Sequence, residues 1–344
     1  MGNWFSTGPE PWCLDPSSLE RWYITNILEG TQKFNSDCSE AVDRLLGSLN
    51  IKCVTAGKNL LDTPDVIKGG SLGKGTMIGG LSEVDLVAYI NPSHLAPICS
   101  SSTQDYRTQL KAVIDELKKA LGRLKNVGIR RSDAYTISFV IEVTGRRFLE
   151  VDLLPTAENF HGYGLGPSDI YKEMLQLSGY DRGFYSASLV KFQWDFVKNQ
   201  PGYVKELISL VKFWACTSLP RALQKSYPLE LITIYRWENA GKPAYFSKAQ
   251  GLKDILKAMT ALQVLRHFWT DMYDADLAEQ AITKLGHRNP ILLDPANPTN
   301  NACWVYQKGD DIDVIAKAAE SSLQTVLLRD VIVYANWSGR ITSE

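Results

Sequence analysis

The segment VIKGGSLGKGTMIGGLSEVDLVAYI, residues 66–90, decides how the chain is interpreted. It contains a glycine-rich loop with one serine, followed by Glu83 and Asp85 inside an apolar run. Successive small residues leave backbone N–H groups able to converge on an anion, and the Ser71 hydroxyl adds a further donor. The loop therefore predicts a phosphate site, and a plain hairpin connection is the alternative.

The two best-known glycine-rich phosphate patterns do not fit this loop. In the P-loop pattern, Lys68 would occupy the first glycine position, and Gly75 follows Lys74 where serine or threonine is required. The dinucleotide fingerprint needs a βαβ unit with a downstream acid for the ribose, and no such unit frames the loop. A turn at Gly69–Ser71 is what remains for phosphate binding.

A third acid lies on another predicted strand. RFLEVDLLP (147–155) alternates so that Glu150 and Asp152 share one face. If this strand pairs with the strand that carries Glu83 and Asp85, Asp152 comes to lie beside them. Carboxylates that share a face repel one another unless cations lie between them, and Mg²⁺ is bound by carboxylate and phosphate oxygens. The pattern predicts a two-ion phosphoryl-transfer site; surface acids on a solvated sheet edge are the alternative.

Periodicity along the chain predicts mixed helices and strands up to about residue 160 and helices beyond it. Helices are expected at 15–50, 105–126, 186–200, 203–219, 228–240, 248–268 and 311–324, and strands at 86–90, 137–143 and 147–155. The glycine-rich stretch HGYGLGPSD (161–169) is a plausible boundary. The chain is therefore expected to divide into residues 1–160 and 161–344.

Composition limits the classes of protein that the chain can form. The 344 residues carry a net charge of -1 and are 44% apolar, as in an ordinary globular protein. The six cysteines are scattered, which indicates reduced thiols and a cytoplasmic location. We find no apolar stretch long enough for a transmembrane helix and no cysteine–histidine cluster for zinc. The first residues, MGNWFS, fit the loose pattern for myristoylation of Gly2, although chance explains so permissive a match more economically.

Six stretches, taken in order, resemble the landmarks of one family. They are VIKGGSLGKGT (66–76), SEVDLVAYI (82–90), FLEVDLLP (148–155), LISLVKFW (207–214), YPLELITIYRWE (227–238) and NPILLDPANPTNN (289–301). Together they resemble the 2'-5'-oligoadenylate synthetases, whose nucleotidyltransferase fold is of the polymerase-β type. The resemblance extends from about residue 20 to 335, nearly the whole chain.

The resemblance implies an α+β fold, with a nucleotidyltransferase catalytic lobe at 1–160, a helical lobe at 161–344 and an active-site cleft between them. It implies ATP as the substrate, two Mg²⁺ ions as cofactor, and a 2'-5' linkage formed with release of pyrophosphate. Motif matching assigns metal binding to Glu83, Asp85 and Asp152, with Asp152 also taking the proton of the attacking hydroxyl. The implied nucleotide contacts are Gly70, Ser71 and Lys212 for the donor phosphates and Ser226 and Tyr227 for the base. A surface lysine and a core tyrosine are the alternatives for Lys212 and Tyr227.

Three positions depart from the family pattern. Glu83 replaces the aspartate of vertebrate members, which indicates a non-vertebrate protein and is common in the related cyclic GMP-AMP synthase-like receptors. Ser209 replaces a donor-side arginine, and Ser226 replaces a glutamine. A cyclic dinucleotide is therefore the alternative product. A non-catalytic RNA-binding relative is disfavoured, because all three metal carboxylates are present.

The family is usually activated by double-stranded RNA, which implies an innate antiviral role and a basic face. Lys198 falls at the position of an RNA-contacting lysine, whereas Trp194 and Tyr203 replace neighbouring basic positions. The lysines that could extend such a face near the first helix are Lys33, Lys52 and Lys58. The most basic run, 118–131, is explained more simply as a solvated helix face. We expect duplex RNA as the activator.

Overall fold

The computed structural model describes residues 10–55, 57, 60–78, 83–100, 102–143, 147–160 and 167–338. The expectations for Gly2 and Lys58 fall outside the described residues. Two compact units are formed. The sheet unit comprises Phe34–Gly75 and Ser82–Lys198, and the helical unit comprises Met1–Lys33, Thr76–Leu81 and Asn199–Glu344. The lobe boundary expected near residue 160 stays a prediction.

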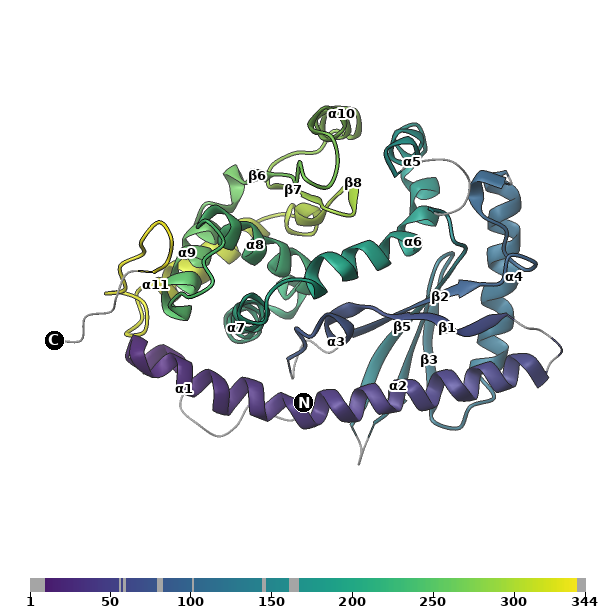
Figure 1. Cartoon of the computed structure of the whole chain (residues 1–344), viewed down its shortest axis with the longest axis horizontal. Helices are drawn as coiled ribbons and strands as arrows, with labels where there is room; N and C mark the ends of the chain where they lie inside the picture. The colour runs from purple at the N-terminus through teal and green to yellow at the C-terminus, as the bar shows by residue number, and fades with distance from the viewer. Residues whose placement is uncertain are drawn as a thin grey trace. The chain divides into compact units, whose positions relative to one another are not determined.

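A five-stranded mixed sheet organises the sheet unit (Figure 1). Its strands are β1 (Leu61–Lys68), β2 (Glu83–Ile90), β3 (Val127–Ser132), β4 (Ile137–Glu142) and β5 (Phe148–Thr156), in the spatial order β1-β2-β5-β4-β3. The central pair, β2 and β5, is parallel, and the other pairs are antiparallel. The helices are α3 (Gly70–Lys74), α4 (Thr103–Leu121), α5 (Pro167–Met174), α6 (Gly179–Lys198) and α2 (Glu29–Thr55), of which the residues up to Lys33 belong to the helical unit.

The long broken helix expected at 15–50 is confirmed. The Asp15 carboxylate accepts hydrogen bonds from the backbone of Ser17 and Ser18 and so caps the first turn. The chain then continues through α1 (Leu19–Tyr23), a π turn (Ile24–Leu28) and α2 without leaving the helical path.

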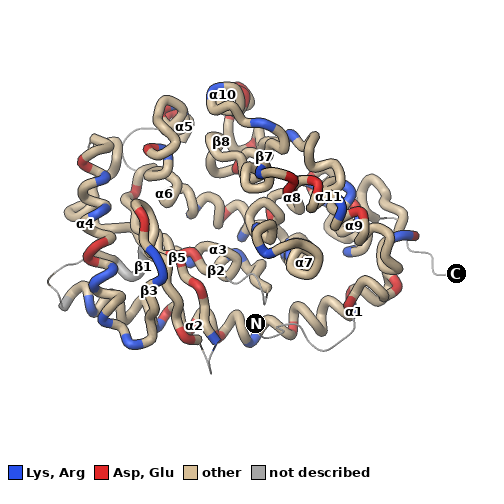
Figure 2. Tube along the Cα trace, turned by 180° about the vertical axis from the view of Figure 1, so that it is seen from behind, with Lys and Arg blue, Asp and Glu red and all other residues tan. Residues whose placement is uncertain are grey.

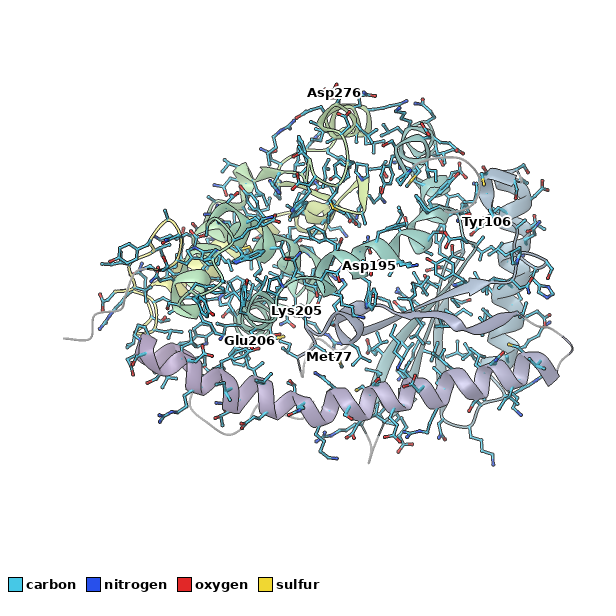
Figure 3. All side chains as sticks on the ribbon, viewed as in Figure 1. Met77, Tyr106, Asp195, Lys205, Glu206 and Asp276 are labelled. Atoms are coloured by element: carbon cyan, nitrogen blue, oxygen red, sulfur yellow. The ribbon has the colours of Figure 1, made fainter. Side chains whose placement is uncertain are left out.

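The two faces of the sheet differ, because successive side chains on a strand point to opposite sides. One face is apolar: Val84, Leu86, Ala88, Ile137, Phe139, Ile141, Leu149, Val151 and Leu153 are all buried. Helix α4 contacts β3 and β5, and Tyr106 on this helix, labelled in Figure 3, is fully buried. The other face carries the acids, and α6 contacts β2 and β5. This division leaves the polar face to form the site.

The helical unit is built mainly from α7 (Gly202–Ser218), α8 (Ser226–Asn239), α9 (Lys248–Thr260), α10 (Ala275–Leu285) and α11 (Asp311–Leu323). A small sheet joins β6 (Arg266–His267), β7 (Ile291–Asp294) and β8 (Asn297–Asn301). The predicted helix 248–268 ends at Thr260, because Arg266 and His267 pair with β7. The α+β class is confirmed. Among the described residues, no helix is both long and apolar enough to cross a membrane.

Candidate active site

The glycine-rich turn lies directly against the backbone of β2. Gly69 N donates a 2.6 Å hydrogen bond to Asp85 O. A Cβ atom added to Gly69 would lie 3.2 Å from that oxygen, so only glycine allows this approach without displacement. Gly70 has a φ of 61°, a left-handed conformation that disfavours other residues. The turn that the sequence identified is therefore held next to one of its two acids.

The short helix α3 continues the turn. A Cβ atom added to Gly73 would lie 1.7 Å from Lys68 O and 2.7 Å from Trp194 Nε1. The backbone of β1 and a side chain of α6 thus close on this glycine from two sides. Ser71 and Lys74 are both buried within α3. Residues 69–75 are therefore a packed part of the sheet unit.

The acids of β2 and β5 are brought side by side, as the alternation predicted. In the parallel register, Asp85 pairs with Asp152 and Glu83 pairs with Glu150. Paired residues on neighbouring strands are about 5 Å apart and point to the same face. Both aspartates are half-buried. Asp152 has no hydrogen-bond or ion-pair partner among the described residues.

This arrangement fits a divalent cation at Asp85 and Asp152. Two carboxylates in register repel each other, and a shared cation removes that repulsion. Glu83 occupies a strand position on the same face of the sheet, two residues before Asp85. Its side chain is not among those that the structure describes. Among the described side chains, no three potential ligands converge. Glu150, exposed beside Glu83 in the register, is an acid that motif matching left without a role, although the strand alternation identified its face.

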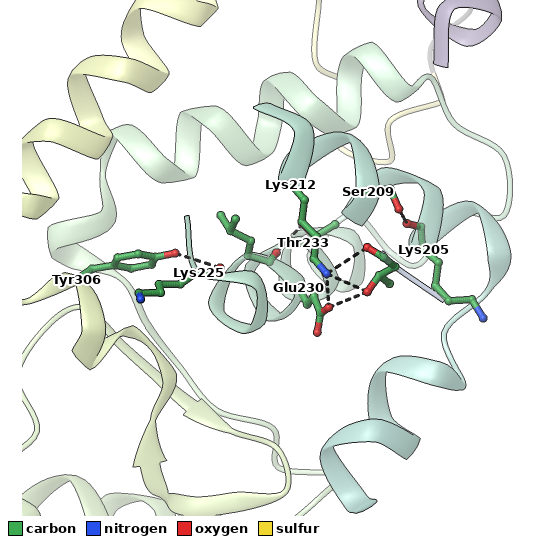
Figure 4. Close-up of polar contacts among 9 residues, drawn as sticks. Lys205, Ser209, Lys212, Lys225, Glu230, Thr233 and Tyr306 are labelled. Atoms are coloured by element: carbon green, nitrogen blue, oxygen red, sulfur yellow. Dashed lines mark hydrogen bonds and ion pairs between the residues drawn. The ribbon is translucent and has the colours of Figure 1, made fainter. Parts of the chain in front are cut away.

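Lys212 belongs to the helical unit and is fully buried there. Its Nζ lies 2.6 Å from Glu230 Oε1, 2.9 Å from Thr76 Oγ1 and 3.2 Å from Thr76 O (Figure 4). Thr76 Oγ1 also donates to Glu230 Oε1 at 2.8 Å. The surface-lysine alternative is therefore wrong. A contact with donor phosphates, which stays a prediction, would require Lys212 to leave this buried cluster.

Ser226 and Tyr227 begin helix α8, also in the helical unit. The Tyr227 hydroxyl donates a 2.8 Å hydrogen bond to the buried Asp294 carboxylate. Burial, followed by the Asp294 charge, raises the pKa of Tyr227 well above its usual value. The Tyr227 residue as a whole is nevertheless partly exposed, as is Ser226. The alternative of a core tyrosine therefore holds for the buried hydroxyl group. Stacking of the Tyr227 ring on a base stays a prediction.

The stretch NPILLDPANPTNN owes its polar residues to turn building. Asp294 accepts the Ala296 N–H and an Asn300 side-chain hydrogen bond, besides that of Tyr227. Asn301 accepts the N–H groups of Leu292 and Cys303. In the β7–β8 connection these side-chain oxygens accept hydrogen bonds from backbone N–H groups in place of backbone oxygens. The polar residues of this stretch therefore stabilise the turn.

The predicted RNA-binding residues are placed as follows. Lys198 is exposed at the end of α6, with its Nζ 3.8 Å from the centroid of the Trp194 ring. Lys33 is exposed on α2. Figure 2 shows further basic segments at β3 and at the end of α4 that leads into it. The structure supplies exposed cations, while their use for RNA stays a prediction.

The sheet with its carboxylates and glycine turn places the chain among nucleotidyltransferase-fold proteins. Two solved structures share the fold: E. coli MS115-1 CdnC in complex with HORMA-deltaN (TM-score 0.55, 19% identity, covering 90% of each chain) and terminal uridylyl transferase 4 from Trypanosoma brucei with bound dUTP (TM-score 0.55, 13% identity, covering 91% of this chain and 99% of that one). Such low identities establish the fold alone.

The family follows from closer relatives. Residues 166–340 match the family model "2'-5'-oligoadenylate synthetase 1, domain 2, C-terminus". The 2'-5'-oligoadenylate synthase 1A of Mus musculus is 30% identical over 323 residues, which cover 87% of this chain and 84% of the relative. The Rattus norvegicus 1A protein is 29% identical, covering 85% of each. The chain belongs to the 2'-5'-oligoadenylate synthetase family.

Two further findings concern the relatives of this chain. "Inactive 2'-5'-oligoadenylate synthase 1B" of Rattus norvegicus is 28% identical and covers 80% of this chain. The relatives of this chain therefore include an inactive protein besides the synthases. The relatives compared are rodent proteins, so the expectation of a non-vertebrate origin finds no support among them.

Proposed function

We propose that this chain is a Mg²⁺-dependent nucleotidyltransferase that joins ATP into 2'-5'-linked oligoadenylates and releases pyrophosphate. The observation that carries the proposal is the parallel register of Asp85 with Asp152, directly beside the Gly69–Ser71 turn. A phosphate-binding turn next to paired carboxylates is the arrangement that phosphoryl transfer through bound divalent ions needs.

Each group of residues has its own role in the proposed reaction. The turn at Gly70–Ser71 binds the donor triphosphate through backbone N–H groups, and Ser226 and Tyr227 contact the donor base. Glu83, Asp85 and Asp152 would hold two Mg²⁺ ions, which supply charge that stabilises the attacking and leaving oxygens. Asp152, whose carboxylate has no partner among the described residues, accepts the proton of the attacking hydroxyl. Lys212 reaches the phosphates only after separating from Glu230.

Double-stranded RNA is the proposed activator, in an innate antiviral response. Exposed Lys198 and Lys33 support this proposal as candidate phosphate contacts. Phosphate contacts release counterions, so stimulation should weaken steeply between about 50 and 200 mM salt. A response that does not change with salt would argue against a polyanionic activator.

A cyclic dinucleotide is the second candidate product. The observation that favours it is Glu83, which gives the E-x-D pair of the cyclic GMP-AMP synthase-like receptors. Both reactions use the same carboxylates and the same turn, so the product itself distinguishes a linear from a cyclic synthase.

The test is to incubate the purified chain with each labelled nucleotide and with all four, in Mg²⁺, with and without duplex RNA. A ladder from ATP alone, sensitive to phosphatase at its ends, supports the oligoadenylate proposal. One phosphatase-resistant product supports the cyclic one. If neither appears under any condition while duplex RNA still binds, the chain is a binding protein.

A further inference from the structure

The edge strand β3 carries an irregularity that changes where one arginine points. Ile129 pairs with Phe139, but the next pair is Arg131 with Ser138, so Arg130 is an extra residue in the strand. Without this bulge, Arg131 would pair with Ile137 and fall on the apolar face. The bulge instead places Arg131 on the face that carries the acids.

The register continues this placement across the sheet. Ser138 pairs with Asp152, and Asp152 pairs with Asp85. One row of side chains therefore crosses four strands: Arg131, Ser138, Asp152 and Asp85. Neighbouring strands are about 4.8 Å apart, so two spacings, roughly 10 Å, separate the Arg131 and Asp152 backbones.

The guanidinium of Arg131 leans toward the acids and is available for a ligand. Its Nε donates a 3.0 Å hydrogen bond to Ser138 Oγ, which places the group over β4, one strand from Asp152. Its terminal amino groups have no partner among the described residues, and Arg131 is exposed. The nearby Asp133 carboxylate instead accepts the N–H groups of Tyr135 and Thr136. An arginine fork with open donors suits a phosphate.

The order of groups along the face indicates which phosphate this is. The Gly69–Ser71 turn lies at the β2 side, next to Asp85, and Arg131 lies at the opposite edge. In phosphoryl transfer the attacking and leaving oxygens are roughly in line on opposite sides of the phosphorus. With the donor phosphates at the turn, the attacking hydroxyl approaches from beyond Asp152. We propose that Arg131 binds a 5'-phosphate of the acceptor nucleotide, and that Ser138 is a positioning residue for Arg131.

This inference rests on the proposed function, and its test separates the two. The donor is saturating 2'-deoxy-ATP, which has no 2'-hydroxyl and so does not act as a 2'-5' acceptor. The acceptors are adenosine, AMP and ADP. Arg131→Gln should raise the KM for the phosphorylated acceptors about ten- to a hundredfold, the range expected for losing one charge-assisted hydrogen bond. The KM for adenosine should stay within about twofold.

Arg130→Gln is the matched control, because it removes the same charge from the adjacent, extra residue. Equal losses in both variants, or an equal loss with adenosine, would overturn the proposal in favour of a general charge effect. An unchanged acceptor KM with lost duplex-RNA stimulation would assign Arg131 to a nucleic-acid surface with the basic run 118–131, and would overturn it too. Arg131→Lys should fall between wild type and Arg131→Gln, since it keeps the charge without the fork.

If neither wild type nor the variants show turnover, a binding measurement tests the role of Arg131. ADP and adenosine are titrated calorimetrically into wild type and Arg131→Gln, each preloaded with 2'-deoxy-ATP and Mg²⁺. Weaker ADP binding with unchanged adenosine binding would support Arg131 even though the proposed function had failed. Equal ADP affinity in both proteins would overturn the role of Arg131.

Discussion

Two groups of charged residues in this chain lie in contrasting environments. On the polar face of the sheet, Asp85 and Asp152 stand side by side and half-buried, and Asp152 has no partner among the described residues. In the helical unit, Lys212 and Glu230 are fully buried and hydrogen-bonded to each other and to Thr76. Asp85 and Asp152, the acidic pair, are like charges in register that repel each other, and a cation can relieve that repulsion, whereas a closed pair of opposite charges is already satisfied.

The difference predicts where each group matters. Removing a charge from the acidic pair should reduce activity and leave the fold intact. Removing a charge from the closed pair should destabilise the fold, because its partner is left buried without compensation.

Asp152→Asn should lower turnover on the order of a thousandfold or more, because charge stabilisation by bound ions is worth several kcal/mol of the barrier. The melting temperature should not fall, since one of two neighbouring like charges is removed. Initial rates and thermal unfolding measure both effects. Glu142→Gln, which removes an exposed acid of β4 on the same face, is the control and should retain activity. Wild-type rates in Asp152→Asn would refute the metal assignment.

Glu230→Gln should lower the free energy of unfolding by about 3–5 kcal/mol, the usual result of leaving a buried charge unpaired. Urea unfolding measures it. Adding Lys212→Met in the same chain should recover most of the loss. Glu206→Gln is the matched control: its partner Lys248 also contacts Glu20, and this partly exposed network should cost no more than about 1 kcal/mol. If Glu230→Gln and Glu206→Gln lower the free energy of unfolding by similar amounts, burial does not determine how much an ion pair contributes to stability.

Gly73→Ala should cost about 1–3 kcal/mol of stability and reduce turnover, because the new Cβ would collide with Lys68 O and force the turn beside Asp85 to move. Gly47→Ala, in the interior of α2 with open space around it, should be neutral or stabilising by up to about 1 kcal/mol. Thermal unfolding and initial rates test the pair. An active, fully stable Gly73→Ala protein would mean that the turn need not be rigid.

Ser138→Ala should have the smallest effect, about a two- to tenfold rise in the KM for ADP as acceptor, because it removes one hydrogen bond that orients the exposed Arg131 guanidinium. The KM for adenosine and the melting temperature should not change. When Ser138→Ala is added to Arg131→Gln, it should raise the KM for ADP no further, because the two residues act through one contact. Additive losses in the double variant would show that Ser138 acts independently of Arg131.

Local sequence explains much of the fold. Alternation in β2, β4 and β5 and the helical periods of α2, α4 and α7 identified most of the elements. Strand β3 was missed because glycine and two arginines interrupt its pattern, and α5 and α10 because they are short. The predicted helix at 248–268 was too long, since pairing with β7 overrides helical propensity there.

The family, the α+β class and the face shared by Glu150 and Asp152 could be predicted from the chain alone, because strand alternation and ordered motifs are local properties. The neighbours of each charge become known only in the folded chain: Asp85 pairs with Asp152, Lys212 is enclosed with Glu230, and a bulge turns Arg131 onto the acidic face. Register and burial depend on residues distant along the chain, and they set the local dielectric and desolvation that determine what a charged side chain does.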